Sequence, residues 1–145
     1  MRFILLLLFV AGNVSVVFSQ DWELDLNTAT EKAKDTNKTI ILVFSGSDWC
    51  APCIKLEKDI WKSETFQEYA KTNFVMLRAD FPRKKANKLP KEQENKNALL
   101  AEKYNPNGYF PSVVILDKNK KVLGVTGYKK LEPKAYIAHL NNFIK

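Results

Sequence analysis

Residues 39–53 read TIILVFSGSDWCAPC, and this stretch decides the fold of the chain. Its first six residues are apolar or β-branched, which predicts a central strand buried on both faces. Residues 45–48 interrupt the apolar run, and a helical pattern follows, with Cys53, Leu56 and Ile60 on one apolar face. The cysteines therefore stand where a buried strand turns into an amphipathic helix.

Cys50 and Cys53 are the only cysteines in the chain. A disulfide between them closes so small a loop that chain entropy predicts only about 2 kcal/mol of stabilisation. A redox couple is the better use of the pair, because one thiolate attacks a partner's disulfide and its neighbour resolves the mixed disulfide. An inert bridge is the alternative.

The predicted helix start assigns different roles to the two sulfurs. Unpaired amide groups and the positive end of the helix dipole stabilise a thiolate, so we expect a lowered pKa for Cys50 as the attacking sulfur. Cys53 lies one turn further along the apolar face, so we expect it to be buried and to act as the resolving sulfur. Ala51 and Pro52 shape the turn, and proline suits the first turn of a helix.

Metal binding has little support in the sequence. Two cysteines and one distant histidine, His139, do not supply the four ligands of a structural zinc site. We therefore expect no metal and no other cofactor. His139 falls at the edge of the apolar stripe of the last predicted helix, and we interpret it as structural.

Residues 1–19 indicate a cleaved secretory signal peptide. Arg2 precedes an almost unbroken apolar run, and Val17 and Ser19 stand at positions −3 and −1 of the expected cut. The run is short for a bilayer span, which takes about 20 residues, although an uncleaved N-terminal anchor is the alternative. We expect residues 20–145 to form a single domain in the periplasm.

The charge of the exported part is positive. Arg2 is the only charged residue before position 20, so 22 of the 23 basic side chains remain against 16 acidic ones, a net charge of +6. Such a balance suits acidic partners or an anionic membrane, or reflects a solvated lysine-rich surface. An exported chain has little occasion to meet nucleic acid, so we expect none as a partner.

The remaining segments alternate between strand and helix patterns. Helices separate the first strands, which predicts parallel pairing, and the last two strands form an antiparallel hairpin. The sequence thus predicts an α/β fold whose central mixed sheet of about four strands has helices on both faces. The predicted strands are 39–44, 73–80, 112–116 and 121–126, and the predicted helices are 27–37 with Asn27 as its cap, one from Ala51, one over 63–70, one near 95–104 and one from Pro133.

The Asp48–Cys53 segment, between a strand and a helix, resembles the active site of the thioredoxin superfamily. The order of elements also matches over residues 22–145, and the longer Ser45–Cys53 segment is most similar to exported bacterial thioredoxin-like and thiol:disulfide interchange proteins. The resemblance implies a thioredoxin-like fold with a cis-proline at Pro111.

The same resemblance implies a substrate-binding surface. The backbone of Phe110, beside Pro111, is expected to pair with a bound substrate chain, and Trp49 is expected to cover the site and contact partners. An ordinary core tryptophan is the alternative for Trp49. The lysine-rich segment over 82–93 is either a docking surface or a solvated loop.

Two positions depart from the family pattern. The buried aspartate that thioredoxins carry six residues before the first cysteine is Phe44 here, and the lysine after the second cysteine is Ile54. Proton transfer at Cys53 must then use water or another group. The sequence assigns no role to Glu57 or Lys58.

The resemblance implies an exported thiol:disulfide oxidoreductase that acts on disulfide-containing exported proteins. Ala51 and Pro52 are similar to the pair found in reducing members, and no histidine lies between the cysteines, so we expect a reductase. We also expect a monomer that a membrane electron donor recharges. The alternatives are a disulfide oxidant or isomerase, or a non-catalytic binding module that uses the Arg83–Lys91 loop with Tyr109 and Phe110.

Overall fold

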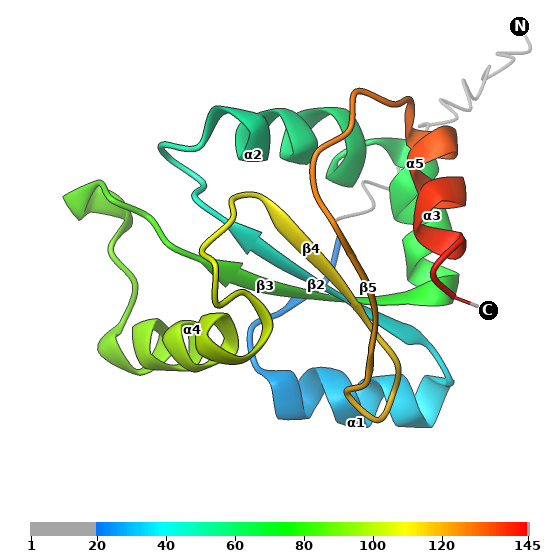
Figure 1. The fold of residues 1–145 in the computed structure, drawn as a ribbon, viewed down its shortest axis with the longest axis horizontal. Coiled ribbons are helices and arrows are strands. Elements are labelled where there is room, and N and C mark those ends of the chain that lie inside the picture. The colour runs from blue at the N-terminus through cyan, green and yellow to red at the C-terminus, as the bar shows by residue number, and fades with distance from the viewer. Residues whose placement is uncertain (1–19, 145) are drawn as a thin grey trace, which may run out of the picture.

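Five strands form one mixed sheet in the computed structural model, which describes residues 20–144 (Figure 1). The strand order is β1-β3-β2-β4-β5, with β1 and β2 parallel to β3, β4 antiparallel to β2, and β5 antiparallel to β4. The strands are β1 (Trp22–Glu23), β2 (Thr39–Ser45), β3 (Phe74–Asp80), β4 (Ser112–Leu116) and β5 (Val122–Thr126). The predicted mixed sheet is confirmed, with one strand more than the sequence indicated.

The additional strand is β1, in which Trp22 pairs with Met76 and Glu23 with Leu77. A strand of two residues has no measurable periodicity, so sequence patterns do not detect it. It extends the parallel part of the sheet beyond β3.

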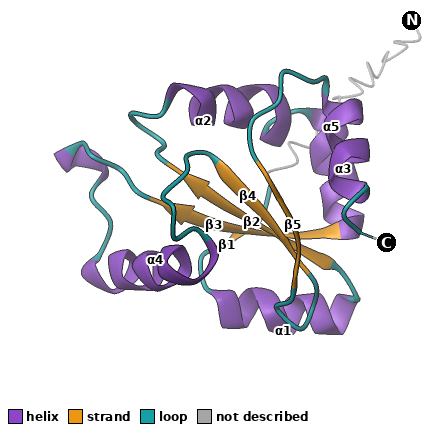
Figure 2. Cartoon of the chain, viewed as in Figure 1, coloured by secondary structure: helices purple, strands orange, loops and turns teal. Residues whose placement is uncertain are grey.

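Helices cover both faces of the sheet, as expected: α2, α3 and α5 lie on one side, and α1 and α4 lie on the other (Figure 2). No helix within residues 20–144 is both long enough and apolar enough to cross a membrane. The helices are α1 (Leu26–Thr36), α2 (Ala51–Leu56), the π-helical turn η1 (Glu57–Trp61), α3 (Glu64–Asn73), the short 3-10 turn η2 (Lys85–Asn87), α4 (Lys91–Tyr104) and α5 (Pro133–Asn141).

Two helix starts differ from the sequence prediction. The cap of α1 is Asp25 rather than Asn27, because the Asp25 carboxylate accepts hydrogen bonds from the backbone N–H groups of Asn27 and Thr28. Helix α4 starts at Lys91 rather than near position 95. Its first turn contains acidic residues, which interact favourably with the positive end of the helix dipole and stabilise a start at this position.

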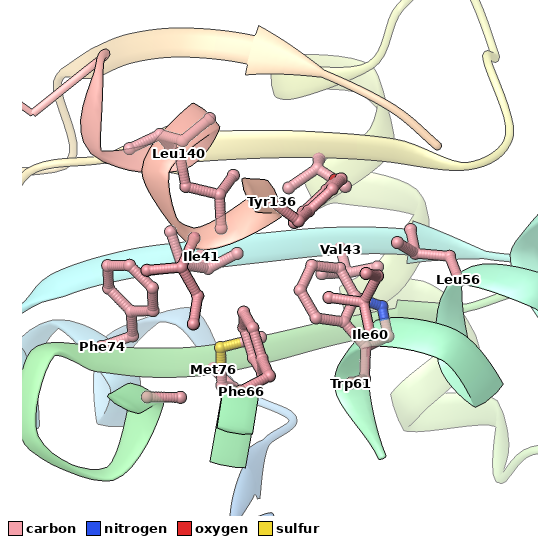
Figure 3. Packing of buried hydrophobic residues seen from close by; sticks show 14 residues of the cluster. Ile41, Val43, Leu56, Ile60, Trp61, Phe66, Phe74, Met76, Tyr136 and Leu140 are labelled. Atoms are coloured by element: carbon pink, nitrogen blue, oxygen red, sulfur yellow. The ribbon is translucent and has the colours of Figure 1, made fainter. Parts of the chain in front are cut away.

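Strand β2 separates two hydrophobic clusters, because successive side chains of a strand point to opposite faces. Ile41 and Val43 belong to the cluster under α2, α3 and α5, where Trp61 is the largest buried side chain (Figure 3). Phe44, together with the other even-numbered residues of β2, belongs to the cluster under α1 and α4.

The topology brings three strand ends to one edge of the sheet. Ser45 at the end of β2 pairs with Asp80 at the end of the parallel β3. Phe44 pairs with Ser112 at the start of the antiparallel β4. The cysteine segment after β2, the loop after β3 and Pro111 before β4 therefore meet at this edge.

Candidate active site

Cys50 and Cys53 form a disulfide at the start of α2, with their Cα atoms 5.2 Å apart. Cys50 is the N-cap of the helix, and its Sγ accepts the backbone N–H of Cys53 at 3.3 Å. The predicted helix start is confirmed, with Ala51 and Pro52 exposed in the first turn. An N–H group directed at Cys50 Sγ favours negative charge on that sulfur.

Both cysteines are buried in this oxidised form, with 4% of Cys50 and 3% of Cys53 exposed. The burial expected for Cys53 is confirmed. The two sulfurs differ in their place on the helix rather than in exposure, because Cys50 caps the helix and Cys53 lies inside it.

The Phe110–Pro111 peptide bond is cis, as the resemblance implied. It directly precedes β4, at the sheet edge that carries the cysteines. The ring of Phe110 lies edge-on to Trp49, with ring centroids 5.4 Å apart, and to Phe81 at 5.5 Å. These three aromatic side chains come from the three segments that meet at this edge.

Trp49 is half-buried and lies outside both core clusters. Its Nε1 donates a hydrogen bond to the carbonyl oxygen of Phe81 at 2.8 Å, and the Arg83 guanidinium lies 3.7 Å from its ring centroid. A Cβ added at Gly46 would come within 2.3 Å of the indole, so the indole lies directly on the backbone of this glycine. The indole is held in place by groups of the site rather than by the core.

Asp48 joins the cysteine segment to the loop after β3. Its carboxylate accepts the backbone N–H groups of Arg83 at 2.9 Å and Lys84 at 3.0 Å, and the Asn87 side-chain amide at 2.9 Å. These bonds lower the pKa of Asp48 below its ordinary value, with the backbone N–H of Arg83 as the largest cause. Sequence analysis missed this role, because backbone donors leave no trace in the sequence.

Phe44 is the residue six positions before Cys50, where thioredoxins carry the aspartate. Its side chain does not face the cysteines. Phe44 is fully buried in the cluster under α1 and α4, whereas Val43, on the other face of β2, packs in the cluster that includes Leu56 of α2. Sequence counting therefore identified the wrong residue for the position behind the cysteines, because it cannot show which face of β2 a residue occupies.

A surface hollow of about 480 Å³ lies beside Cys53 on the α2 side of the sheet. The Glu57 carboxylate, one helical turn after Cys53, lies in its wall and forms a 2.6 Å ion pair with Arg78 of β3. The Arg78 guanidinium also lies 4.0 Å from the ring centroid of Trp22. The hollow is lined by Ser45, Ser47, Cys53, Ile54, Glu57, Lys58, Lys62 and Arg78.

Sequence analysis assigned no role to Glu57 or Lys58, yet both line this hollow. A usable signal was present for Glu57: four residues after Cys53 on a helix, it falls on the same face as the cysteine. No comparable signal existed for Arg78, which reaches Glu57 from another element.

His139 contacts residues of α5 and β5 away from the cysteines. Its Nε2 lies 2.8 Å from Thr126 Oγ1, and its ring lies edge-on to Tyr136 and Phe143. Burial, with a smaller effect of Lys129, lowers the pKa of His139. These contacts support the structural interpretation, and residues 20–144 contain no group of three or more potential metal ligands.

Comparison with known proteins identifies relatives of this chain. The family model for thioredoxin-like proteins matches residues 21–118. Disulfide bond reductase DsbH of Chlamydia pneumoniae is 37% identical over 117 residues, which cover 81% of this chain and 69% of that protein.

Solved structures show the same relationship. A structure of DsbH oxidoreductase superposes with a TM-score of 0.80 at 31% identity, covering 94% of this chain and 92% of the other. A thioredoxin from Thermus thermophilus, at 13% identity and a TM-score of 0.61 over 85% of each chain, shares the fold. This chain therefore belongs to the thioredoxin-like family and carries the Cys50/Cys53 pair of a disulfide oxidoreductase.

Proposed function

We propose that this protein is an exported reductase of disulfides in other exported proteins. The observation that carries the proposal is the Cys50–Cys53 disulfide at the N-cap of α2, on the same sheet edge as the cis Phe110–Pro111 bond. The direction of the reaction is supported by the similarity to a relative named disulfide bond reductase. It is also supported by the absence of a titratable side chain between the cysteines.

The reaction starts from the reduced protein. The Cys50 thiolate attacks one sulfur of a substrate disulfide, forms a mixed disulfide and releases the other substrate sulfur as a thiolate, which takes up a proton. Cys53 then loses its proton and attacks Cys50 Sγ, which releases the second substrate thiol and forms the Cys50–Cys53 disulfide. Two electrons and two protons pass to the substrate, and a membrane dithiol donor restores the reduced protein.

The attacking thiolate is stabilised by the start of α2. The Cys53 N–H that reaches Cys50 Sγ is one of the first-turn amides without a helical partner, and the helix dipole acts in the same direction. Cys53 lies inside the helix and lacks this stabilisation, so it retains its proton until the mixed disulfide forms. This difference assigns attack to Cys50 and resolution to Cys53.

The proton of Cys53 leaves through the hollow beside it. Glu57 is a carboxylate in the wall of this hollow, and we propose that water in the hollow relays the proton from the thiol to it. Glu57 thus takes the place of the aspartate that other family members use. Its ion pair with Arg78 holds the carboxylate in the wall of the hollow.

The substrate chain binds along the aromatic side of the disulfide. From the family resemblance, we expect the backbone of Phe110 to pair with the substrate segment, Pro111 to lie against the disulfide and Trp49 to cover it. Export follows from the signal peptide proposed for residues 1–19, which lie outside the described residues, and we propose a monomeric mature protein in the periplasm.

Two measurements test the proposal. The Cys50/Cys53 reduction potential in a glutathione buffer is expected near that of reducing members, about −270 mV, rather than near the −120 mV of strong oxidants. Insulin reduction should proceed with the wild-type protein and fail with Cys50→Ser. A potential near −150 mV would overturn the reductase assignment in favour of an oxidant or isomerase. Equal turnover by both proteins would leave only a binding module.

A further inference from the structure

The loop between β3 and α4 carries positive charge next to the active site. Residues 83–88, which we call the basic loop, contain four basic side chains and no acidic one. All four are exposed, and none takes part in an ion pair found within residues 20–144. These side chains are Arg83, Lys84, Lys85 and Lys88.

The basic loop is fastened to the cysteine segment rather than free in solvent. Three of its donors bind the Asp48 carboxylate, two residues before Cys50. Just before the loop, the backbone N–H of Phe81 donates to the carbonyl oxygen of Ser45 at 2.8 Å. Beyond the loop, the buried Asn97 side chain of α4 donates to the carbonyl oxygen of Asp80. The backbone that carries the four charges therefore keeps a defined place relative to the disulfide.

The basic loop also continues the aromatic side of the site. Arg83 stacks on Trp49, which contacts Phe110, and the adjacent Tyr109 is 67% exposed. A polypeptide that reaches the disulfide along Trp49 and Phe110 thus passes beside the unpaired cations. The hydrogen bonds of Asp48, the carboxylate bound to the loop, come from backbone donors and an amide rather than from the lysine ammonium groups.

We propose that the basic loop binds acidic residues that flank the target cysteine in the substrate protein. This inference rests on the proposed reductase function and specifies its substrate class. Fixed cations beside a reaction site raise the local concentration of oppositely charged substrate. The Debye length of about 8 Å at physiological ionic strength limits the effect to two or three residues of an extended chain. The basic loop therefore recognises acidic residues within two or three positions of the target cysteine in the substrate.

An anionic membrane surface would also attract lysines, but the position of the loop favours a substrate chain. The basic loop borders the aromatic side chains of the site, so a membrane bound to it would cover the disulfide and hinder reduction. A substrate segment bound to the same lysines presents its disulfide to Cys50.

The test compares two disulfide-bonded peptides that differ only in having glutamate or glutamine beside each cysteine. At low ionic strength the wild-type protein should reduce the glutamate peptide with a kcat/KM about tenfold higher, and salt of about 0.5 M should abolish the difference. The triple variant Lys84→Gln/Lys85→Gln/Lys88→Gln should lose this preference. These changes leave the backbone donors to Asp48 intact.

The matched control, Lys34→Gln/Lys118→Gln/Lys121→Gln, removes three exposed lysines at the opposite end of the sheet and should keep the preference. Reduction of an uncharged small disulfide reports on the cysteines alone and should be equal in all three proteins. If the wild type reduces this compound but shows no peptide preference, the inference fails and the reductase assignment stands. If it reduces nothing, the reductase assignment fails.

Two further results would overturn the inference. An equal loss of preference in both triple variants would assign the effect to net charge instead of the loop. Loss of binding to phosphatidylglycerol vesicles in the loop variant, with the peptide preference intact, would assign the loop to a membrane surface.

Discussion

The carboxylate of Glu57 pairs with the guanidinium of Arg78 at 2.6 Å, in the wall of the hollow that reaches Cys53. Glu57 comes from the helical segment that carries the cysteine, and Arg78 comes from β3. The pair thus lies on the proton route that we propose for Cys53, where other family members use an aspartate.

The first prediction concerns this carboxylate. Glu57→Gln should slow resolution of the mixed disulfide by roughly tenfold, less than for a directly bonded acid–base group, because the proton passes through water. Stopped-flow fluorescence of the resolution step measures the effect. The distant exposed carboxylate in Glu102→Gln serves as the control, and equal resolution rates in both variants would remove Glu57 from the proton route.

The second prediction concerns the order in which the cysteines act. Cys53→Ser should accumulate a mixed disulfide between Cys50 and the substrate, because the N-cap sulfur attacks and no resolving sulfur remains. Cys50→Ser should accumulate little. Non-reducing gels after incubation with a disulfide peptide distinguish the variants, and a reversed pattern would mean that Cys53 attacks first.

The third prediction concerns Asp48. Asp48→Asn should speed amide hydrogen exchange at Arg83 and Lys84, because a neutral amide with one oxygen cannot replace a carboxylate that accepts three donors. The control is Asp117→Asn, which alters a carboxylate that accepts two backbone N–H groups at the other end of the sheet. Unchanged exchange at Arg83 would show that Asp48 does not hold the loop.

Acid should reproduce this loosening in the wild-type protein. The folded-state pKa of Asp48 lies below the ordinary value of 3.8, so the stabilisation of the loop by the Asp48 carboxylate is complete above pH 3.8. This stabilisation is lost as the pH falls through the lowered pKa. Exchange at Arg83, corrected for its intrinsic pH dependence, should therefore rise at low pH in the wild type and not in Asp48→Asn.

The fourth prediction concerns the contact between Gly46 and Trp49. Gly46→Ala should cost about 1–3 kcal/mol in the free energy of unfolding, because the new methyl group displaces the indole. The displaced indole loses its hydrogen bond to Phe81. In a Trp49→Ala background the same change should cost little. Denaturant unfolding of the wild type, the two single variants and the double variant should therefore reveal coupling between the two positions. Additive costs of the two substitutions would contradict a contact between Gly46 and Trp49.

The main elements of the fold could be predicted from local patterns. The apolar run of β2 is continuous, the cysteine helix has a single apolar stripe, and Pro133 starts the last helix as expected. The missed strand β1 has only two residues, and its pairing with β3 depends on contacts that no local pattern contains. The cap at Asp25 was missed because Asn27, two residues later, was an equally good candidate.

Residues of the candidate site could be predicted where their signal lies in one continuous stretch of sequence. Cys50 and Cys53 were found from their spacing, and the resemblance indicated the cis bond before Pro111. The error at Phe44 has a simple cause: alternation along a strand is visible in the sequence, but which face meets α2 depends on how the helices pack.

The sequence by itself determined the redox pair, its position at a helix start and the order of strands and helices, because each depends on residues close together in the chain. Only the tertiary structure decided what surrounds the pair. Asp48 meets the basic loop and Glu57 meets Arg78 because β2 and β3 lie side by side and in parallel, which brings segments 21 or more residues apart to one edge. Contacts of this kind follow from the packing of the whole sheet rather than from any local stretch of sequence.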